Sequence, residues 1–219
     1  MRLKLTKTEA DRLNNEGIAN IKILEPNNPR AQEFTDRMIS HSKLVAEAAE
    51  RIASLISDMD AEKAYIYGIL HDYGKYFGDV ENKNTFHGLV GYEKLIEMGY
   101  PDIAKINLTH TFVSKEFTIE EYSAYNQKDM IKTKELVDAL EFDDYDKLLQ
   151  LCDLLPKKFD RCEVEGYEGI EKRFERIERV YNIPQKTARK KVQEAIGLKE
   201  YFEQKCGCNI YELLGIKND

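Results

Sequence analysis

Apolar residues recur every three or four positions along most of the chain, which is the spacing of amphipathic helices. The longest such stretch covers residues 29–56 and contains twenty-eight residues. Asn28 followed by Pro29 predicts the N-cap and first position of this helix, and its length leads us to predict a break near Ser40. Its apolar positions are Phe34, Met38, Leu44, Val45, Ala48, Ile52, Leu55 and Ile56.

The same spacing predicts further helices to the end of the chain. Asp60 is the expected N-cap of a second helix and Gly74 its expected end, while Gly99 closes a third. Residues 111–131 mix apolar and polar positions and predict either an irregular excursion or a short helix. Residues 19–24 predict either an edge strand or no regular structure. The predicted helices cover 61–75, 87–98, 101–110, 134–140, 144–155, 167–183, 184–206 and 209–214.

These elements predict an all-α fold, a helical bundle with extra C-terminal helices. We divide the chain into an N-terminal segment (1–28), a metal-binding helical domain (29–160) and a C-terminal helical cap of the same domain (161–219). The last helices contain no histidine, so we interpret them as a cap on the bundle or an interaction surface.

Composition narrows the class of protein. Hydrophobic residues make up 42% and charged residues 33% of the 219 residues, which is typical of a globular domain. No apolar run approaches the roughly 18 residues needed to cross a bilayer, and the first residues do not resemble a signal peptide. We therefore expect a cytoplasmic protein that does not bind membranes.

Charge argues against duplex nucleic acid as a partner. The formal net charge is −7, whereas nucleic-acid binding usually requires a basic face. A basic cluster at Lys186, Arg189, Lys190 and Lys191 is interpreted as the solvated face of a helix. The cysteines, interpreted as reduced thiols because no disulfide framework is visible, are Cys152, Cys162, Cys206 and Cys208.

Histidine usage points to a metal site. All four histidines, His41, His71, His87 and His110, fall within seventy residues, and His71 is followed directly by Asp72. Neutral imidazole and carboxylate together suit Zn, Mn and Fe. Four histidines in one segment, one of them joined to an aspartate at the end of an apolar helix, therefore predict a metal centre.

The predicted helices bring these ligands into two groups. His41, His71, Asp72 and Asp153 are expected to hold a first ion, with the His71–Asp72 pair at the frayed end of its helix. His87 and His110 each lie at a helix terminus and are expected to hold a second ion, bridged to the first by Asp72 (these six residues are the predicted metal ligands). Two divalent ions, two carboxylates and a bridging hydroxide would give the metal centre a net charge of about +1. Such a centre favours an anionic substrate such as a phosphate ester.

Lys75 lies one turn beyond His71 and is expected to reach a substrate phosphate or the attacking water. The alternative is that it only interacts with the dipole of its helix. We expect the substrate pocket to be lined by residues 111–130, beginning with Thr111, and by the loop after Tyr76. Asp72 and Lys75 are the predicted catalytic residues, and Lys75 and Thr111 the predicted substrate contacts.

The order H…HD…H…H…D, with the local string LLHDYGK reduced to HD-x-G-K, resembles the HD superfamily of metal-dependent phosphohydrolases. The resemblance covers roughly residues 35–160 and implies a helical bundle. His41, the pair His71–Asp72 and Asp153 match its core motif, and His87 and His110 match the extra ligands of its two-metal members. The HG-x-x-G string and the lysine are similar to small bacterial HD hydrolases of dinucleoside tetraphosphates, and to cyclic-dinucleotide phosphodiesterases whose GYP motif is absent here.

The resemblance implies a hydrolase that uses two divalent ions (Fe, Mn or Zn). Metal-bound hydroxide would cleave a nucleotide or another small phosphoester or phosphoanhydride. The partner would be a small phosphorylated molecule. Two alternatives remain: a di-iron oxygenase of the HD type, and a regulatory or binding module that keeps the fold without chemistry.

Overall fold

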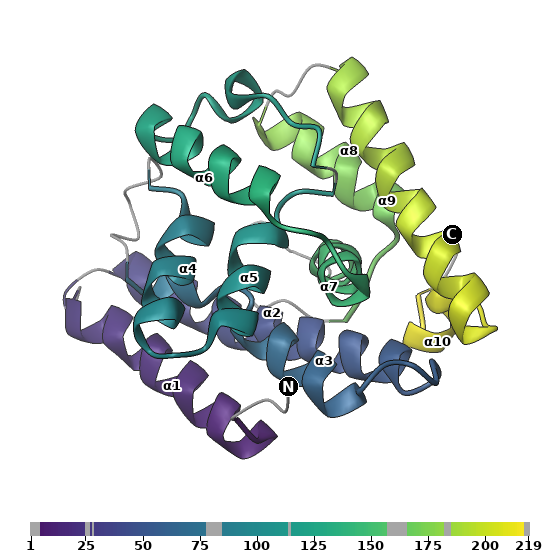
Figure 1. Cartoon of the computed structure of the whole chain (residues 1–219), viewed down its shortest axis with the longest axis horizontal. Coiled ribbons are helices and arrows are strands. Elements are labelled where there is room, and N and C mark those ends of the chain that lie inside the picture. The colour runs from purple at the N-terminus through teal and green to yellow at the C-terminus, as the bar shows by residue number, and fades with distance from the viewer. Residues whose placement is uncertain are drawn as a thin grey trace.

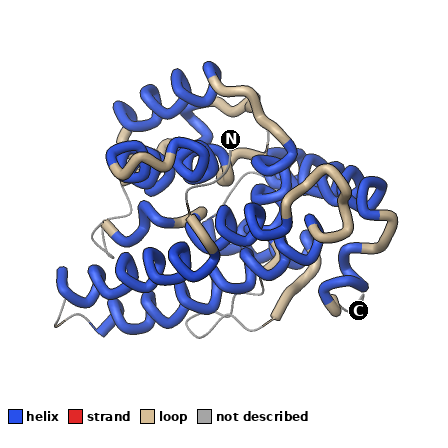
Figure 2. Tube along the Cα trace, turned by 60° about the horizontal axis from the view of Figure 1, so that its bottom comes forward, coloured by secondary structure: helices blue, strands red, loops and turns tan. Residues whose placement is uncertain are grey.

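The computed structural model describes residues 5–24, 27, 29–77, 85–113, 115–156, 166–181 and 185–216. Within these ranges the regular structure is helical and contains no strand (Figure 2), so the predicted all-α fold is confirmed. The elements are α1 (Lys7–Leu24), α2 (Pro29–Ala53), α3 (Ala61–Leu70), the 3₁₀ helix η1 (Tyr73–Tyr76), α4 (His87–Glu97), α5 (Pro101–Thr109), the 3₁₀ helix η2 (Ile119–Tyr122), α6 (Gln127–Ala139), α7 (Asp144–Leu154), α8 (Ile170–Tyr181), α9 (Gln185–Cys206) and α10 (Ile210–Leu214).

Helix α7 runs through the middle of the bundle and is seen end-on in Figure 1. It contacts α2, α3, α5 and α9. Its apolar residues Leu148, Leu149 and Leu151 are fully buried. Helix α1 packs on α2 and α3, and α9 packs on α7 and α8. The division at residues 28 and 160 remains a prediction.

Two sequence predictions for the N-terminal half are wrong. Helix α2 runs without interruption through Ser40, because Met38, Val45 and Ala49 keep one buried face along it. Residues 19–24 belong to α1 rather than to an edge strand, since Ile18 and Ile21 lie on the buried side of a helix that begins well before them. The proposed N-cap at Asn28 lies outside the described residues.

The predicted helix ends are partly confirmed. The Asp60 side chain accepts a hydrogen bond from the backbone N–H of Lys63 at 3.1 Å, as an N-cap does. Gly99 follows α4 with a φ of 81°. Gly74, however, does not end α3, because the helix stops at Leu70 and a 3₁₀ turn follows.

Gly74 is instead required by a close approach between η1 and α4. A Cβ at this position would lie 1.9 Å from the carbonyl oxygen of His87 and 2.5 Å from the amide nitrogen of Gly91. Similarly, a Cβ at Gly68 would lie 2.5 Å from the Cα of Ala46, so α3 packs directly against the backbone of α2. These two glycines bring the end of α3 close to α2 on one side and to α4 on the other.

Residues 111–113 and 115–122 pack on a small hydrophobic cluster beside the main core. Phe112 and Phe117 are buried in it, with ring centroids 4.1 Å apart and nearly parallel planes. Both sequence alternatives for this stretch apply in part, because irregular chain is followed by the short helix η2. The cluster contains Phe86, Leu89, Leu108, Phe112, Phe117, Met130 and Val137.

The remaining surface predictions have mixed outcomes. Cys152, Cys206 and Cys208 are free thiols, as predicted, whereas Cys162 and the side chain of Lys186 lie outside the described residues. Arg189 and Lys190 are exposed but Lys191 is partly buried, so the basic cluster is not a uniformly solvated face. No described helix has the length and apolar character to span a membrane.

Candidate metal centre

Four of the predicted ligands converge in one group, in which His41, His71 and Asp72 are buried and Asp153 is partly exposed. Nε2 of His41 lies 2.9 Å from Oδ1 of Asp153 and 3.4 Å from Oδ2 of Asp72. Nε2 of His71 lies 3.2 Å from Nε2 of His41, 3.2 Å from Oδ2 of Asp72 and 3.5 Å from Oδ1 of Asp153. Ligand atoms bound to one ion through bonds of about 2.0–2.2 Å are roughly 2.8–3.6 Å apart. The spacing of these four atoms therefore fits a single divalent cation.

A second group of three ligand atoms lies on the other side of Asp72. Oδ1 of Asp72 is 3.2 Å from Nε2 of His87 and 3.3 Å from Nε2 of His110. The two imidazole Nε2 atoms are 3.3 Å apart. This nearly equilateral triangle has the donor types and spacing of one face of a metal coordination sphere.

Asp72 belongs to both groups through different oxygens, Oδ2 toward the first and Oδ1 toward the second. Its carboxylate is 1% exposed. Oδ1 receives no hydrogen bond of acceptable geometry within the described part of the chain, although two ring nitrogens lie beside it. A buried carboxylate oxygen in this state is costly unless a cation neutralises it. The residues present thus fit the binding of divalent metal, with one candidate ligand group on each side of Asp72.

Backbone carbonyls orient two of the imidazoles. Nδ1 of His71 is 2.7 Å from the carbonyl oxygen of Gly68, and Nδ1 of His110 is 3.1 Å from that of Ile106. Because a carbonyl oxygen only accepts, each Nδ1 carries the hydrogen and each Nε2 presents its lone pair. This is the arrangement in which a histidine binds a metal through Nε2.

The electrostatics of the first group favour a positive charge. Burial by itself lowers the pKa of His71, but the carboxylates of Asp72 and Asp153 outweigh burial and raise this pKa to about 9. Burial raises the pKa of Asp72, yet the Lys75 ammonium and His71 hold it well below its usual range. The carboxylates of the first group therefore attract positive charge, as a site that binds a metal ion must.

The second group is electrostatically different. Burial, and then the charge of Lys75, lower the pKa of His87 to about 4. His87 is therefore a neutral imidazole at pH 7, which is the protonation state that a metal ligand requires.

The predicted substrate contacts lie at the edge of the two groups. Nζ of Lys75 donates to Oδ2 of Asp72 at 2.5 Å, so this side chain turns toward the ligands rather than toward the carbonyls at the end of its helix. Oγ1 of Thr111 lies 3.3 Å from Nε2 of His110. The loop after Tyr76 lies outside the described residues from 78 to 84.

Sequence reasoning missed the residue that joins these segments. Asn107 is fully buried; its Nδ2 donates to the carbonyl oxygen of Leu70 at 2.7 Å, and its Oδ1 accepts from the amide of Gly74 at 3.4 Å. The side chain thereby holds α5 against both ends of the His71–Asp72 turn. Its position three residues before His110 was the available signal, but asparagine in a helix is usually solvent-facing.

A second missed group supports the turn after α5. The buried carboxylate of Asp146 accepts from the hydroxyl of Thr109 at 2.7 Å and pairs with Lys105 at 2.5 Å. Nε2 of Gln150 donates to the carbonyl oxygen of Thr109 at 3.1 Å. Helix α7, which carries Asp153, therefore also fixes the residue before His110.

Comparison with protein families agrees with this geometry. The family model described as "HD domain" matches residues 38–157, more than half of the chain. The chain belongs to the HD-domain family. All six predicted ligands lie within the matched residues. Neither the curated proteins nor the solved structures contain a match to the chain.

Membership of the HD-domain family agrees with the donor set described above. HD domains generally bind divalent metals and are commonly metal-dependent phosphohydrolases. The cluster of histidines and aspartates in this member is compatible with such a metal site. The family therefore indicates a metal-dependent function of hydrolase type.

Proposed function

We propose that this HD-domain protein is a phosphohydrolase that cleaves a nucleotide or another small phosphoester or phosphoanhydride with two divalent ions. The observation that carries the proposal is the division of the Asp72 carboxylate between two ligand groups. Bridged two-metal sites are a recurrent solution for phosphoryl-transfer chemistry. The proposed ligands are His41, His71, Asp72 and Asp153 for one ion, and Asp72, His87 and His110 for the other.

The ions would supply Lewis acidity and lower the pKa of coordinated water, which provides a nucleophile near neutral pH. The chain supplies the remaining functions. Nζ of Lys75 lies beside Asp72, and its side chain is 26% exposed. It is therefore near enough to the ligands and open enough to solvent to hydrogen-bond a phosphoryl oxygen.

Thr111 is the second proposed substrate contact. Its hydroxyl lies next to Nε2 of His110, on the side of the group for which the described residues supply three ligand atoms. Burial of His41, His71 and Asp72 excludes bulk water from the first group, whereas His87, with a 17% exposed side chain, opens to solvent. Substrate is thus expected to approach over His87 and Thr111.

The proposal is tested by metal analysis of the purified protein combined with a phosphate-release screen. The screen would use nucleoside mono-, di- and triphosphates, diadenosine tetraphosphate and p-nitrophenyl phosphate, with Mn²⁺, Fe²⁺ or Zn²⁺ added to metal-free protein. We expect metal-dependent phosphate release that does not require dioxygen. Absence of release from all substrates with every metal would contradict the proposal, and oxygen consumption would favour the oxygenase alternative.

A further inference from the structure

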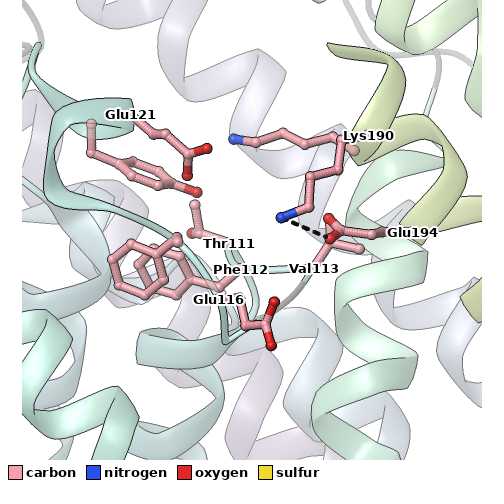
Figure 3. A pocket seen from close by; sticks show the side chains of 10 residues that line it. Thr111, Phe112, Val113, Glu116, Glu121, Lys190 and Glu194 are labelled. Carbon is pink, nitrogen blue, oxygen red and sulfur yellow. Dashed lines mark ion pairs between the residues drawn. The ribbon is translucent and has the colours of Figure 1, made fainter. Parts of the chain in front are cut away.

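Helix α9 forms one wall of a hollow beside Thr111 (Figure 3). The charged side chains that line this hollow are three glutamates and two lysines. Lys190 and Glu194 pair there at 3.6 Å, so the charges of the wall largely cancel. The thiol groups of α9 and of the segment after it lie at the other end of the helix, where the chain turns into α10 (Figure 1).

Two thiols meet in the turn between α9 and α10. Cys206 is the last residue of α9, and Cys208 directly precedes Asn209, the N-cap of α10. The Sγ atoms of the two cysteines lie 3.3 Å apart, and both side chains are partly exposed. A reagent from solution can therefore reach two thiols that already lie in contact.

Gly207 brings the two cysteines together. Its φ is 70°, in the left-handed region that glycine adopts without strain. Its amide donates a hydrogen bond to the carbonyl oxygen of Glu203 at 2.9 Å, as a glycine at the end of a helix commonly does. The reversal of the chain at this glycine places the sulfur atoms before and after it side by side.

The thiols of the turn differ from the thiol in the core. Sγ of Cys206 donates to the carbonyl oxygens of Glu203 at 3.8 Å and Cys208 at 3.5 Å, and a thiol is only a weak donor. Cys152, in contrast, is fully buried, and burial raises the pKa of its thiol. Buried thiols of this kind are inert, so the reactive cysteines among those that the structure describes are the two in the turn.

We propose that Cys206 and Cys208 form a reversible dithiol–disulfide site that is oxidised by a small-molecule disulfide such as oxidised glutathione. The closed form links the end of α9 to the residue before the N-cap of α10. A disulfide that is exposed to solvent is also readily reduced again. The inference is independent of the phosphohydrolase function, because neither cysteine belongs to a ligand group and both lie outside residues 38–157.

Two exchange steps give a balanced reaction. The Cys206 thiolate attacks one sulfur of oxidised glutathione, so a mixed disulfide forms, the glutathione disulfide breaks and one glutathione leaves as a thiol. The Cys208 thiolate then attacks the Cys206 sulfur and releases the second glutathione. The protein loses two electrons and two protons, which the two glutathione thiols gain.

The order of the two attacks follows from the environment of Cys208. Burial, and then the hydrogen bond with Cys206, raise the pKa of Cys208 to about 11. This thiol therefore keeps its proton at pH 7, and the thiolate is the attacking species in thiol–disulfide exchange. The first attack is accordingly assigned to Cys206 and the closing attack to Cys208.

The test uses the whole chain with Cys162→Ser, in which Cys206, Cys208 and the buried Cys152 are the remaining thiols. The protein is incubated with oxidised glutathione at a concentration that leaves Cys152 reduced. Free thiols are then alkylated, and the peptides are analysed by mass spectrometry. We expect a peptide in which Cys206 and Cys208 together have lost two hydrogens and carry neither an alkyl group nor glutathione. Dithiothreitol should restore both thiols.

Cys208→Ser in the same background is the matched control, because it keeps the attacking thiol and removes the closing one. This variant should retain glutathione on Cys206, whereas the parent protein should lose it in the closing step. Complete alkylation of both cysteines in the parent protein would overturn the proposal. Stable glutathione adducts on the parent protein, or a disulfide between two copies of the chain, would overturn it as well.

Discussion

Nδ2 of Asn107 donates a hydrogen bond to the carbonyl oxygen of Leu70, the residue immediately before His71, at 2.7 Å. This contact ties α5, which ends just before His110, to the turn that carries His71 and Asp72. Nδ2 also reaches the carbonyl oxygen of Ile103 at 3.2 Å. The buried amide of Asn107 thus helps to hold the two ligand groups in place relative to each other.

Asn107→Ala should weaken metal binding as well as stability. Removing the amide leaves buried backbone groups without partners, which costs about 1–3 kcal/mol, and loss of an outer-shell contact typically lowers metal affinity about 10- to 100-fold. Asn126→Ala is the matched control, because Asn126 caps α6 and belongs to neither ligand group; the substitution should cost about 0.5–2 kcal/mol. Thermal melts should show both losses, whereas metal titration should distinguish the two variants. Equal metal affinity would contradict the positioning role.

Asp72→Ala should abolish phosphate release and lower metal content, because both ligand groups lose a carboxylate oxygen. Asp102→Ala provides a control at an exposed position in the first turn of α5 and should change neither quantity. Elemental analysis measures the metal content of each variant, and a phosphate assay measures its turnover. Wild-type turnover in the Asp72→Ala protein would exclude the proposed mechanism.

His87→Ala should remove one ion and leave the other. His87 contributes only to the group formed with Asp72 and His110, and the four ligand atoms of the other group remain intact. Metal analysis after dialysis should therefore give about half of the wild-type metal content. An unchanged stoichiometry would show that His87 is not a ligand.

Lys75→Met should slow turnover about 10- to 1000-fold, comparable to the loss of one preorganised charge-stabilising donor. Metal content should remain unchanged because an ammonium group cannot be a ligand. If Lys75 acted only on the helix dipole, the variant would instead lose roughly 0.3–1 kcal/mol of stability with a normal rate. One rate assay and one thermal melt separate these outcomes.

The ion pair between Lys205 and Asp144 joins α9 to the start of α7 at 2.5 Å. Burial raises the pKa of Asp144, but Lys205 and Tyr201 outweigh burial and lower it. A lowered carboxyl pKa stabilises the native state above the unfolded value of about 3.9, and this contribution is lost as pH falls through the folded pKa.

Lys205→Met should therefore lower the free energy of unfolding by about 0.2–1 kcal/mol at pH 7. The difference in melting temperature from the wild type should shrink below about pH 4. Lys128→Met, which removes an exposed ammonium from α6, should show little effect at either pH. A difference that stays constant with pH would indicate lost packing rather than lost charge.

The residues that the structure brings together in the two groups could be selected from the sequence, because the selection depends mainly on residue type and on helix ends. Histidine and aspartate at the ends of apolar helices can be recognised without knowing how those helices pack. Asn107 and Lys191 could not be recognised this way. The role of Asn107 depends on contacts with Leu70 and Gly74 from another segment, and the burial of Lys191 depends on Tyr122, which lies far away in sequence.

The fold predictions failed where local patterns were weak. Residues 19–24 are β-like in composition, but a helix that starts at Lys7 continues through them. Gly74 resembles a helix end in the sequence, whereas its actual requirement is space for the backbone of α4. Close approaches between segments leave no local signal.

The metal ligands also have a consequence for the folding of the chain. His41 in α2 and Asp153 in α7 come from distant segments, yet their ligand atoms lie 2.9 Å apart. In the unfolded chain only His71 and Asp72 are neighbours, so high-affinity metal binding requires the native bundle. Ions bound at this position would act as a non-covalent cross-link among α2, α4, α5 and α7, and their binding energy would add to the free energy of unfolding. Metal supply would then set the lifetime of the native protein as well as its activity.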